Sequence, residues 1–114
     1  MIIDDSSFMR KRIGNAVRQA GHEVIGTARE GAEGFEMYRE LRPDLVIMDI
    51  TMQGVDGIQA AGMIRHEDPE AKIVFMSLVT DPDVMCKAQE LGALDFLGKN
   101  DSEKLSSIMD GLEK

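Results

Sequence analysis

The sequence predicts one α/β domain, spanning residues 1–114, in which five short strands alternate with five helices. Three observations indicate this fold class. Short apolar runs alternate with segments whose apolar residues recur at helical spacing, which is the pattern of a parallel sheet built from βαβ units. The run at 45–48 is apolar at four consecutive positions, as in a strand covered by helices on both faces. Polar residues that can bind a metal or a phosphoryl group directly follow several of these runs.

The strands are expected where an apolar run ends at a polar or glycine-bearing loop. The first run is short, which suggests that residues of this strand precede the given N-terminus. The predicted strands are Met1–Asp4, Glu23–Thr27, Asp44–Asp49, Lys72–Met76 and Asp95–Leu97.

The helices are expected where apolar residues line one stripe at a spacing of three or four. Gly21 and Gly92 end the first and fourth helices, and Pro43 ends the second. Pro82 suits the first helical position after Asp81 as N-cap. The five stripes are Met9, Ile13, Val17 and Ala20; Phe35, Tyr38 and Leu41; Ile58, Ala61 and Ile64; Val84, Ala88 and Leu91; and Leu105, Ile108, Met109 and Leu112.

Composition restricts the classes of function. The chain has 43% hydrophobic and 30% charged residues, as an ordinary globular domain does. A net charge of −8 argues against a broad nucleic-acid surface, which needs clustered Lys and Arg. No apolar run approaches the roughly 20 residues of a membrane span, and the N-terminus lacks the regions of a signal peptide. The single Cys86 cannot form an internal disulfide, so we expect a cytoplasmic location.

Five polar side chains are expected to converge at one edge of the sheet. Asp4, Asp5, Asp49, Ser77 and Lys99 each follow or end a predicted strand. In a parallel sheet with right-handed crossovers, the strand-to-helix loops all emerge at the same edge, where open α/β proteins place their chemistry. The sequence therefore predicts one site with three carboxylates, one hydroxyl and one ammonium group.

This set of groups suits a divalent cation and a phosphoryl group. Carboxylate oxygens are the ligands that Mg²⁺ prefers, and a cation would relieve the repulsion among three acids. An aspartate can itself attack phosphorus, and the transferring group then needs positive charge and hydrogen-bond donors around it. A structural alternative is that Asp4 or Asp5 caps the helix that begins near Ser7.

These motifs resemble the receiver domain of two-component response regulators, in its chemotaxis-type (CheY-like) subgroup. The resemblance covers essentially the whole chain and rests on the segment 3–10, the segment 43–52 with Asp56-Gly57, the pair Met76-Ser77 and the segment 95–99. It implies a doubly wound, flavodoxin-like sheet of five parallel strands in the order 2-1-3-4-5, flanked by five helices.

The resemblance also implies the role of each residue in the phosphoryl chemistry. Asp49 would accept the phosphoryl group from a sensor histidine kinase or a histidine phosphotransfer protein. Ser77 and Lys99 would hold the phosphoryl oxygens. Ser77 and Phe96 would act as switch residues that change a binding surface for a downstream target protein or an attached output domain.

The cation site follows from the same resemblance. Mg²⁺ would be bound by Asp5, by Asp49 and by the backbone carbonyl of Thr51. Asp4 would contribute mainly through water. No direct contact with nucleic acid or membrane is implied.

Three residues depart from the family's pattern in the loops around the site. Gln53 and Asn100 replace prolines that are usual there, and Leu78 replaces a small residue beside the switch hydroxyl. We expect altered kinetics and a trans Lys99–Asn100 bond, since a cis bond before a residue other than proline costs about 2.5–4 kcal/mol. The alternative is a receiver with impaired phosphorylation that acts as a constitutive protein-interaction module.

Two other classes of function are disfavoured. A phosphohydrolase of the haloacid-dehalogenase type needs a second aspartate two residues after the nucleophile, and Thr51 stands there. A flavin-binding protein would need a first loop that accepts phosphate, whereas Asp4-Asp5 would repel it. We therefore expect no turnover of external substrates, only phosphoryl transfer and hydrolysis at the chain's own Asp49.

Overall fold

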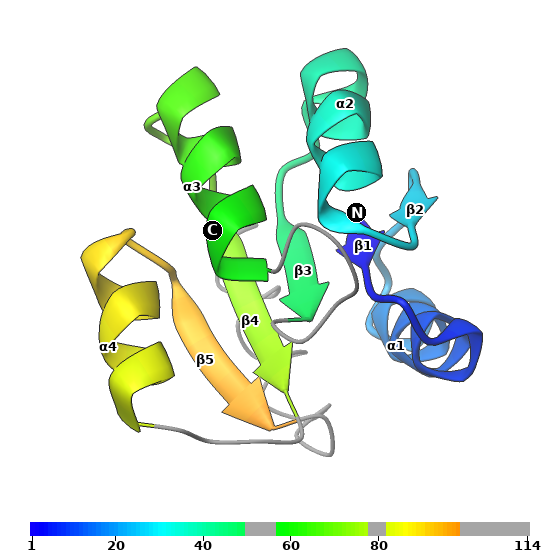
Figure 1. Cartoon of the computed structure of the whole chain (residues 1–114). Helices are drawn as coiled ribbons and strands as arrows, with labels where there is room; N and C mark the ends of the chain where they lie inside the picture. Colours follow the sequence, from blue (N-terminus) through cyan, green and yellow to red (C-terminus); the bar gives the residue numbers. More distant parts are fainter. Residues whose placement is uncertain (50–56, 78–81, 99–114) are drawn as a thin grey trace.

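The strands form one parallel sheet. The computed structural model describes residues 1–49, 57–77 and 82–98, with the strands in the order β2-β1-β3-β4-β5 (Figure 1). The strands are β1 (Ile2–Ile3), β2 (Thr27–Ala28), β3 (Val46–Asp49), β4 (Ile73–Ser77) and β5 (Asp95–Gly98). This is the order that the family resemblance implies. β2 lies on one side of β1, and β3 lies on the other. The order in which strands are added therefore reverses between β1 and β3, which makes this the topological switch point of the sheet.

The second strand is shorter and later than predicted. We expected Glu23–Thr27, whereas β2 comprises only Thr27 and Ala28. The length of β2 is limited by its partner β1. Because Ile2, the first residue of β1, pairs with Thr27, the residues before Thr27 have no β1 residue to pair with. A single hydrogen bond, from the Ile2 amide to the Gly26 carbonyl at 3.1 Å, extends the contact beyond the paired residues.

Helices cover both faces of the sheet. The described helices are α1 (Ser7–Gln19), α2 (Gly31–Leu41), α3 (Gly57–Glu67) and α4 (Pro82–Glu90). Helix α1 lies on one face of the sheet, and α2, α3 and α4 lie on the other (Figure 1). Gly21 and Gly92 follow α1 and α4 with positive φ angles of 87° and 78°, the left-handed conformation that ends helices. The fifth helix expected after residue 100 lies outside the described residues.

Successive strand residues belong to opposite halves of the core. In β4, Ile73 and Phe75 join the cluster under α2, α3 and α4, whereas Val74 and Met76 join the cluster under α1. The same alternation divides Ile47 from Val46 and Met48 in β3. Apolar residues at every position are therefore required by burial on both faces.

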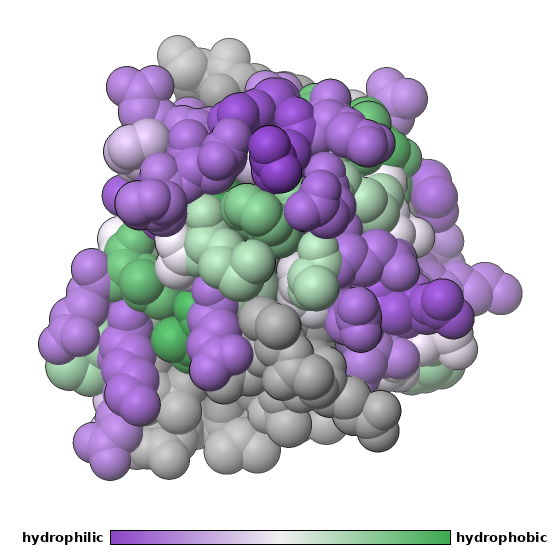
Figure 2. Space-filling view, turned by 45° about the horizontal axis from the view of Figure 1, so that its top comes forward, coloured by the Kyte–Doolittle hydropathy of each residue, from purple (hydrophilic) through white to green (hydrophobic). Residues whose placement is uncertain are grey.

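The face of the molecule shown in Figure 2 is mainly hydrophilic where its residues are described. In Figure 2, hydrophilic side chains surround a smaller area of apolar ones. The large apolar side chains that are exposed belong to separate segments of the chain, namely Phe8, Ile25, Leu41, Met63 and Leu94. Among the helices that the structure describes, none has the length and apolar character needed to cross a bilayer.

A hydrogen bond connects the end of α2 to the end of α3. The buried Tyr38 hydroxyl donates to Asp68 Oδ2 at 2.7 Å. Arg42 reaches the same carboxylate at 3.5 Å and Glu67 at 3.5 Å, from half-exposed positions where ion pairs contribute little. Burial, and then the bond to Asp68, raises the pKa of Tyr38 to about 12. The prediction that Tyr38 belongs to the core is confirmed, and its hydroxyl ties the two helices together.

Gly34→Ala and Gly62→Ala are expected to change stability in opposite directions. A Cβ on Gly34 of α2 would overlap the Ile3 side chain, which is fully buried, so we expect a loss of about 1–3 kcal/mol. A Cβ on Gly62 of α3 would meet only Leu91 Cδ2 at 3.7 Å, so better helix propensity should stabilise the variant by about 0.5–1 kcal/mol. Urea unfolding of both variants measures this, and equal shifts would contradict the close packing at Gly34.

Tyr38→Phe is expected to lower the free energy of unfolding by about 1 kcal/mol, because a hydrogen bond from a buried hydroxyl is lost. The Tyr38 hydrogen bond is also the main cause that lowers the pKa of Asp68. A lowered carboxyl pKa contributes stability above the unfolded value of about 3.9, and that contribution is lost as pH falls through the folded pKa. The difference in the free energy of unfolding between Tyr38→Phe and the wild type should therefore become smaller as the pH falls. Urea titrations at neutral and acidic pH test this, and a constant difference would contradict the assignment.

Candidate phosphoryl and cation site

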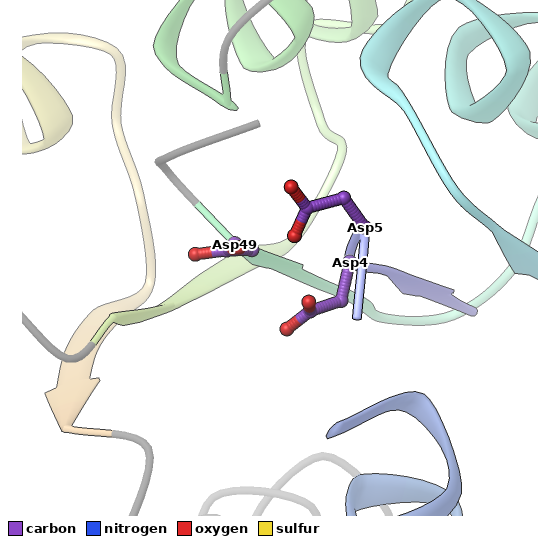
Figure 3. A group of neighbouring side chains, drawn as sticks. All are labelled: Asp4, Asp5 and Asp49. Atoms are coloured by element: carbon purple, nitrogen blue, oxygen red, sulfur yellow. The ribbon is translucent and has the colours of Figure 1, made fainter. Parts of the chain in front are cut away.

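Three carboxylates meet at the carboxyl edge of the sheet. Asp4 and Asp5 follow β1, and Asp49 is the last residue of β3. One carboxylate oxygen of each lies within 4.8 Å of the others (Figure 3). The pairing of Ile3 with Met48 causes this, because it leaves Asp4 and Asp49 as the next residues on neighbouring strands. The predicted convergence of these three acids is therefore confirmed.

Asp4 is held by the backbone at the start of α1. It is 1% exposed, and its Oδ1 accepts a hydrogen bond from the Ser6 amide at 2.9 Å. The Arg10 guanidinium donates to the Asp4 carbonyl at 2.7 Å. Ser6 is the N-cap of α1, since its hydroxyl accepts from the Met9 amide at 3.2 Å. The capping alternative for Asp4 or Asp5 is therefore wrong.

The three acids differ in their access to solvent. Asp49 is 4% exposed and Asp4 1%, whereas Asp5 is exposed. In Figure 3 the Asp4 and Asp5 side chains extend to different sides of the loop, with Asp49 alongside from the neighbouring strand. Two buried carboxylates beside an exposed one form a site that solvent reaches from the side of Asp5. Oxygen ligands in this arrangement suit a divalent cation such as Mg²⁺.

The remaining predicted residues are placed only partly. Ser77 ends β4, one strand beyond Asp49, and Phe96 lies in β5 opposite Phe75. Their backbones thus belong to β4 and β5, whereas their side chains lie outside the described part of the structure, so their roles stay predictions. Thr51, Lys99 and the three departures Gln53, Leu78 and Asn100 lie outside the described residues, as does the Lys99–Asn100 bond.

Sequence reasoning missed three residues near the carboxylates. The cap at Ser6 had a usable signal, namely a serine immediately before a helical apolar stripe. The Arg10 contact with the Asp4 carbonyl had none, because it depends on how the loop folds back over the helix. Arg29 lines a cavity of about 380 Å³ together with Asp5, Glu30 and Glu33, and only the adjacency of β1 and β2 reveals this.

Comparison with known proteins agrees with this geometry. A family model described as the response regulator receiver domain matches residues 1–110. The chemotaxis protein CheY of Thermotoga maritima is 42% identical over 99 residues, which cover 87% of this chain and 82% of that protein. The chemotaxis protein CheY of Listeria monocytogenes is 36% identical over 114 residues, covering 100% of this chain and 94% of that protein.

A solved structure shows the same fold. A chain of the CheX–CheY–BeF3–Mg²⁺ complex from Borrelia burgdorferi matches with a TM-score of 0.91 and 28% identity, covering 99% of this chain and 87% of that one. The chain therefore belongs to the response regulator receiver domain family, and its relatives include CheY chemotaxis proteins.

Asp5→Asn is expected to stabilise the protein without divalent cations, by up to about 1 kcal/mol, because it removes one of three adjacent negative charges. Added Mg²⁺ should raise the melting temperature of the wild type more than that of the variant, since stabilisation follows affinity. Asp44→Asn is the matched control, because exposed Asp44 precedes β3 at its opposite end. Equal Mg²⁺-dependent shifts in wild type and Asp5→Asn would contradict a cation site at these carboxylates.

Proposed function

We propose that the chain is a phosphoacceptor receiver of a two-component phosphorelay, with Asp49 as the acceptor. The observation that carries the proposal is the group of three carboxylates at the carboxyl edge of β1 and β3, in a chain of the receiver family. Asp49 ends a fully buried strand, so its carboxylate is held in place by the sheet. A fixed carboxylate oxygen is the geometry that a nucleophile toward phosphorus needs.

In the proposed reaction, an oxygen of Asp49 forms a bond to phosphorus while the bond from phosphorus to a histidine nitrogen of the donor breaks. Ser77 and Lys99 donate to the phosphoryl oxygens, and Phe96 responds to their movement as a switch residue. These roles come from the family resemblance. The position of Ser77 at the end of the strand next to β3 supports its part.

Asp5, Asp49 and the Thr51 carbonyl would hold Mg²⁺, with Asp4 acting through water. The cation would supply positive charge that offsets the carboxylates and the incoming phosphoryl group. The donor set supports this proposal, since the described acids offer one oxygen each within 4.8 Å. The matched complex from Borrelia burgdorferi contains Mg²⁺ and BeF3.

The output would be a change in protein binding. A sensor histidine kinase or histidine phosphotransfer protein would supply the phosphoryl group, and a target protein or attached output domain would bind the switched surface. Chemistry would be limited to the chain's own Asp49, with no turnover of external substrates. The negative charge and the single cysteine support a cytoplasmic location without direct contact with nucleic acid or membrane.

Incubation with acetyl phosphate and Mg²⁺ is expected to add the mass of one phosphoryl group to the wild type. Asp49→Asn should abolish the gain, because an amide is a far weaker nucleophile than a carboxylate. Asp44→Asn should retain it, since Asp44 precedes the opposite end of β3. Intact-mass spectrometry measures all three proteins.

Two outcomes would contradict the proposal. A modified Asp49→Asn protein would move the nucleophile to another acid. A folded wild type that gains no mass with any donor would favour the constitutive interaction module instead.

A further inference from the structure

A cavity lies beside Asp5, lined by residues that follow β1 and β2. Its volume is about 380 Å³, and its lining side chains are Asp5, Arg29, Glu30 and Glu33. Arg29 directly follows β2, Glu30 is the N-cap of α2, and Glu33 lies in the first turn of that helix. Because Asp5 also belongs to the three-carboxylate group, the cavity is the solvent side of the candidate site.

Arg29 brings a positive charge to this cavity. Its side chain is exposed, and within the described part of the chain its guanidinium makes no hydrogen bond or ion pair. Other arginines are engaged: Arg10 donates to the Asp4 carbonyl, and Arg42 lies 3.5 Å from both Glu67 and Asp68. The charge of Arg29 is therefore available to whatever enters the cavity.

The cavity and the carboxylates beside it are strongly acidic. Among the described residues, its lining carries three carboxylates and one guanidinium, and Asp4 and Asp49 add two more acids next to it. Such a field attracts Mg²⁺ but repels a phosphoryl donor, which carries negative charge. A receiver must bind both a cation and a phosphoryl donor at this opening. Negative charge favours the first and opposes the second.

We propose that Arg29 sets the balance between these demands: its charge weakens cation binding at the carboxylates and favours the approach of an anionic phosphoryl donor. The donor half of this inference rests on the proposed function, since its target is Asp49. The cation half depends only on the carboxylates and on the position of Arg29 in the same cavity.

Coulomb's law gives the size of the effect. A unit charge about 10 Å from a divalent ion in a water-like medium changes its binding by roughly fourfold at low salt. Ions at physiological strength screen charges over about 8 Å, so the effect should shrink as salt is added. A dianionic donor should experience an effect of similar size and opposite sign.

The first measurement is calorimetric titration of the metal-free proteins with Mg²⁺ at low ionic strength. Arg29→Gln should bind Mg²⁺ about two- to fourfold more tightly than the wild type, and Arg29→Lys should match the wild type. Glu30→Gln should bind it more weakly, and this change spares the helix because the Glu30 side chain makes no capping hydrogen bond. Arg18→Gln, an exposed arginine in the last turn of α1, is the control for a general loss of positive charge.

The second measurement is the initial rate of phosphoryl mass gain with acetyl phosphate at saturating Mg²⁺. Arg29→Gln should be about two- to fourfold slower, and Arg29→Lys should restore the rate. Added salt should bring the two rates together. A purely structural role for Arg29 would not tighten Mg²⁺ binding while slowing the donor.

The outcomes separate the inference from the proposed function. Equal Mg²⁺ affinity in Arg29→Gln and the wild type overturns the role of Arg29, whatever the mass measurement shows. If the variants show the expected order of Mg²⁺ affinities but the wild type is not phosphorylated, the proposed function is overturned. The effect of Arg29 on cation binding is then still supported. Tighter Mg²⁺ binding with an unchanged phosphorylation rate overturns the donor half alone.

Discussion

The parallel pairing of β1 with β3 is the interaction on which the site depends. Ile3 pairs with Met48, so the next residue of each strand is an aspartate, and neighbouring strands lie only about 4.8 Å apart. Like charges at this distance repel, and the sheet tolerates them because the residues before them are fully buried. The fold therefore holds the carboxylates together before any ligand is present. A divalent cation at this site would find three carboxylates already close together, with little ordering cost.

The core on both faces of the sheet gives that pairing its rigidity. Alternate residues of β3 and β4 enter two separate apolar clusters, so a shift of either strand by one residue would move each side chain to the wrong face. Gly34 of α2 lies directly against Ile3, which fixes how closely that helix approaches β1. β1, which leads into Asp4, is thus held by β2 and β3 at its sides and by α2 against one face.

Charge is distributed unevenly around the carboxyl edge. Arg10 is drawn to the backbone of Asp4 and steadies the loop, whereas Arg29 faces the cavity beside Asp5. The two arginines therefore differ in role. Arg10 is structural because it donates a hydrogen bond to the Asp4 carbonyl, and Arg29 acts through its charge on the cavity. The tie between Tyr38 and Asp68 plays a comparable structural role where α2 and α3 end.

The sequence alone determined the parallel α/β architecture and the identity of the acids. The apolar runs at 45–48 and 73–76 are each followed directly by a polar residue. They contain enough local information to place strands and their carboxyl ends. The cap at Ser6 could also have been found this way, because capping depends on residues within one turn. The pattern could not give the start of β2, because Thr27 pairs with Ile2, the first residue of β1.

Only the tertiary structure decided that Arg29 lies beside the carboxylates. The position of Arg29 beside Asp5 depends on how the segments that follow β1 and β2 meet. No local periodicity encodes such a meeting, because it results from strand order and helix packing across the whole sheet. The acids could be identified in the sequence because each lies at or just after the end of a strand, whereas Arg29 acquires its role from a neighbour that is remote in the chain.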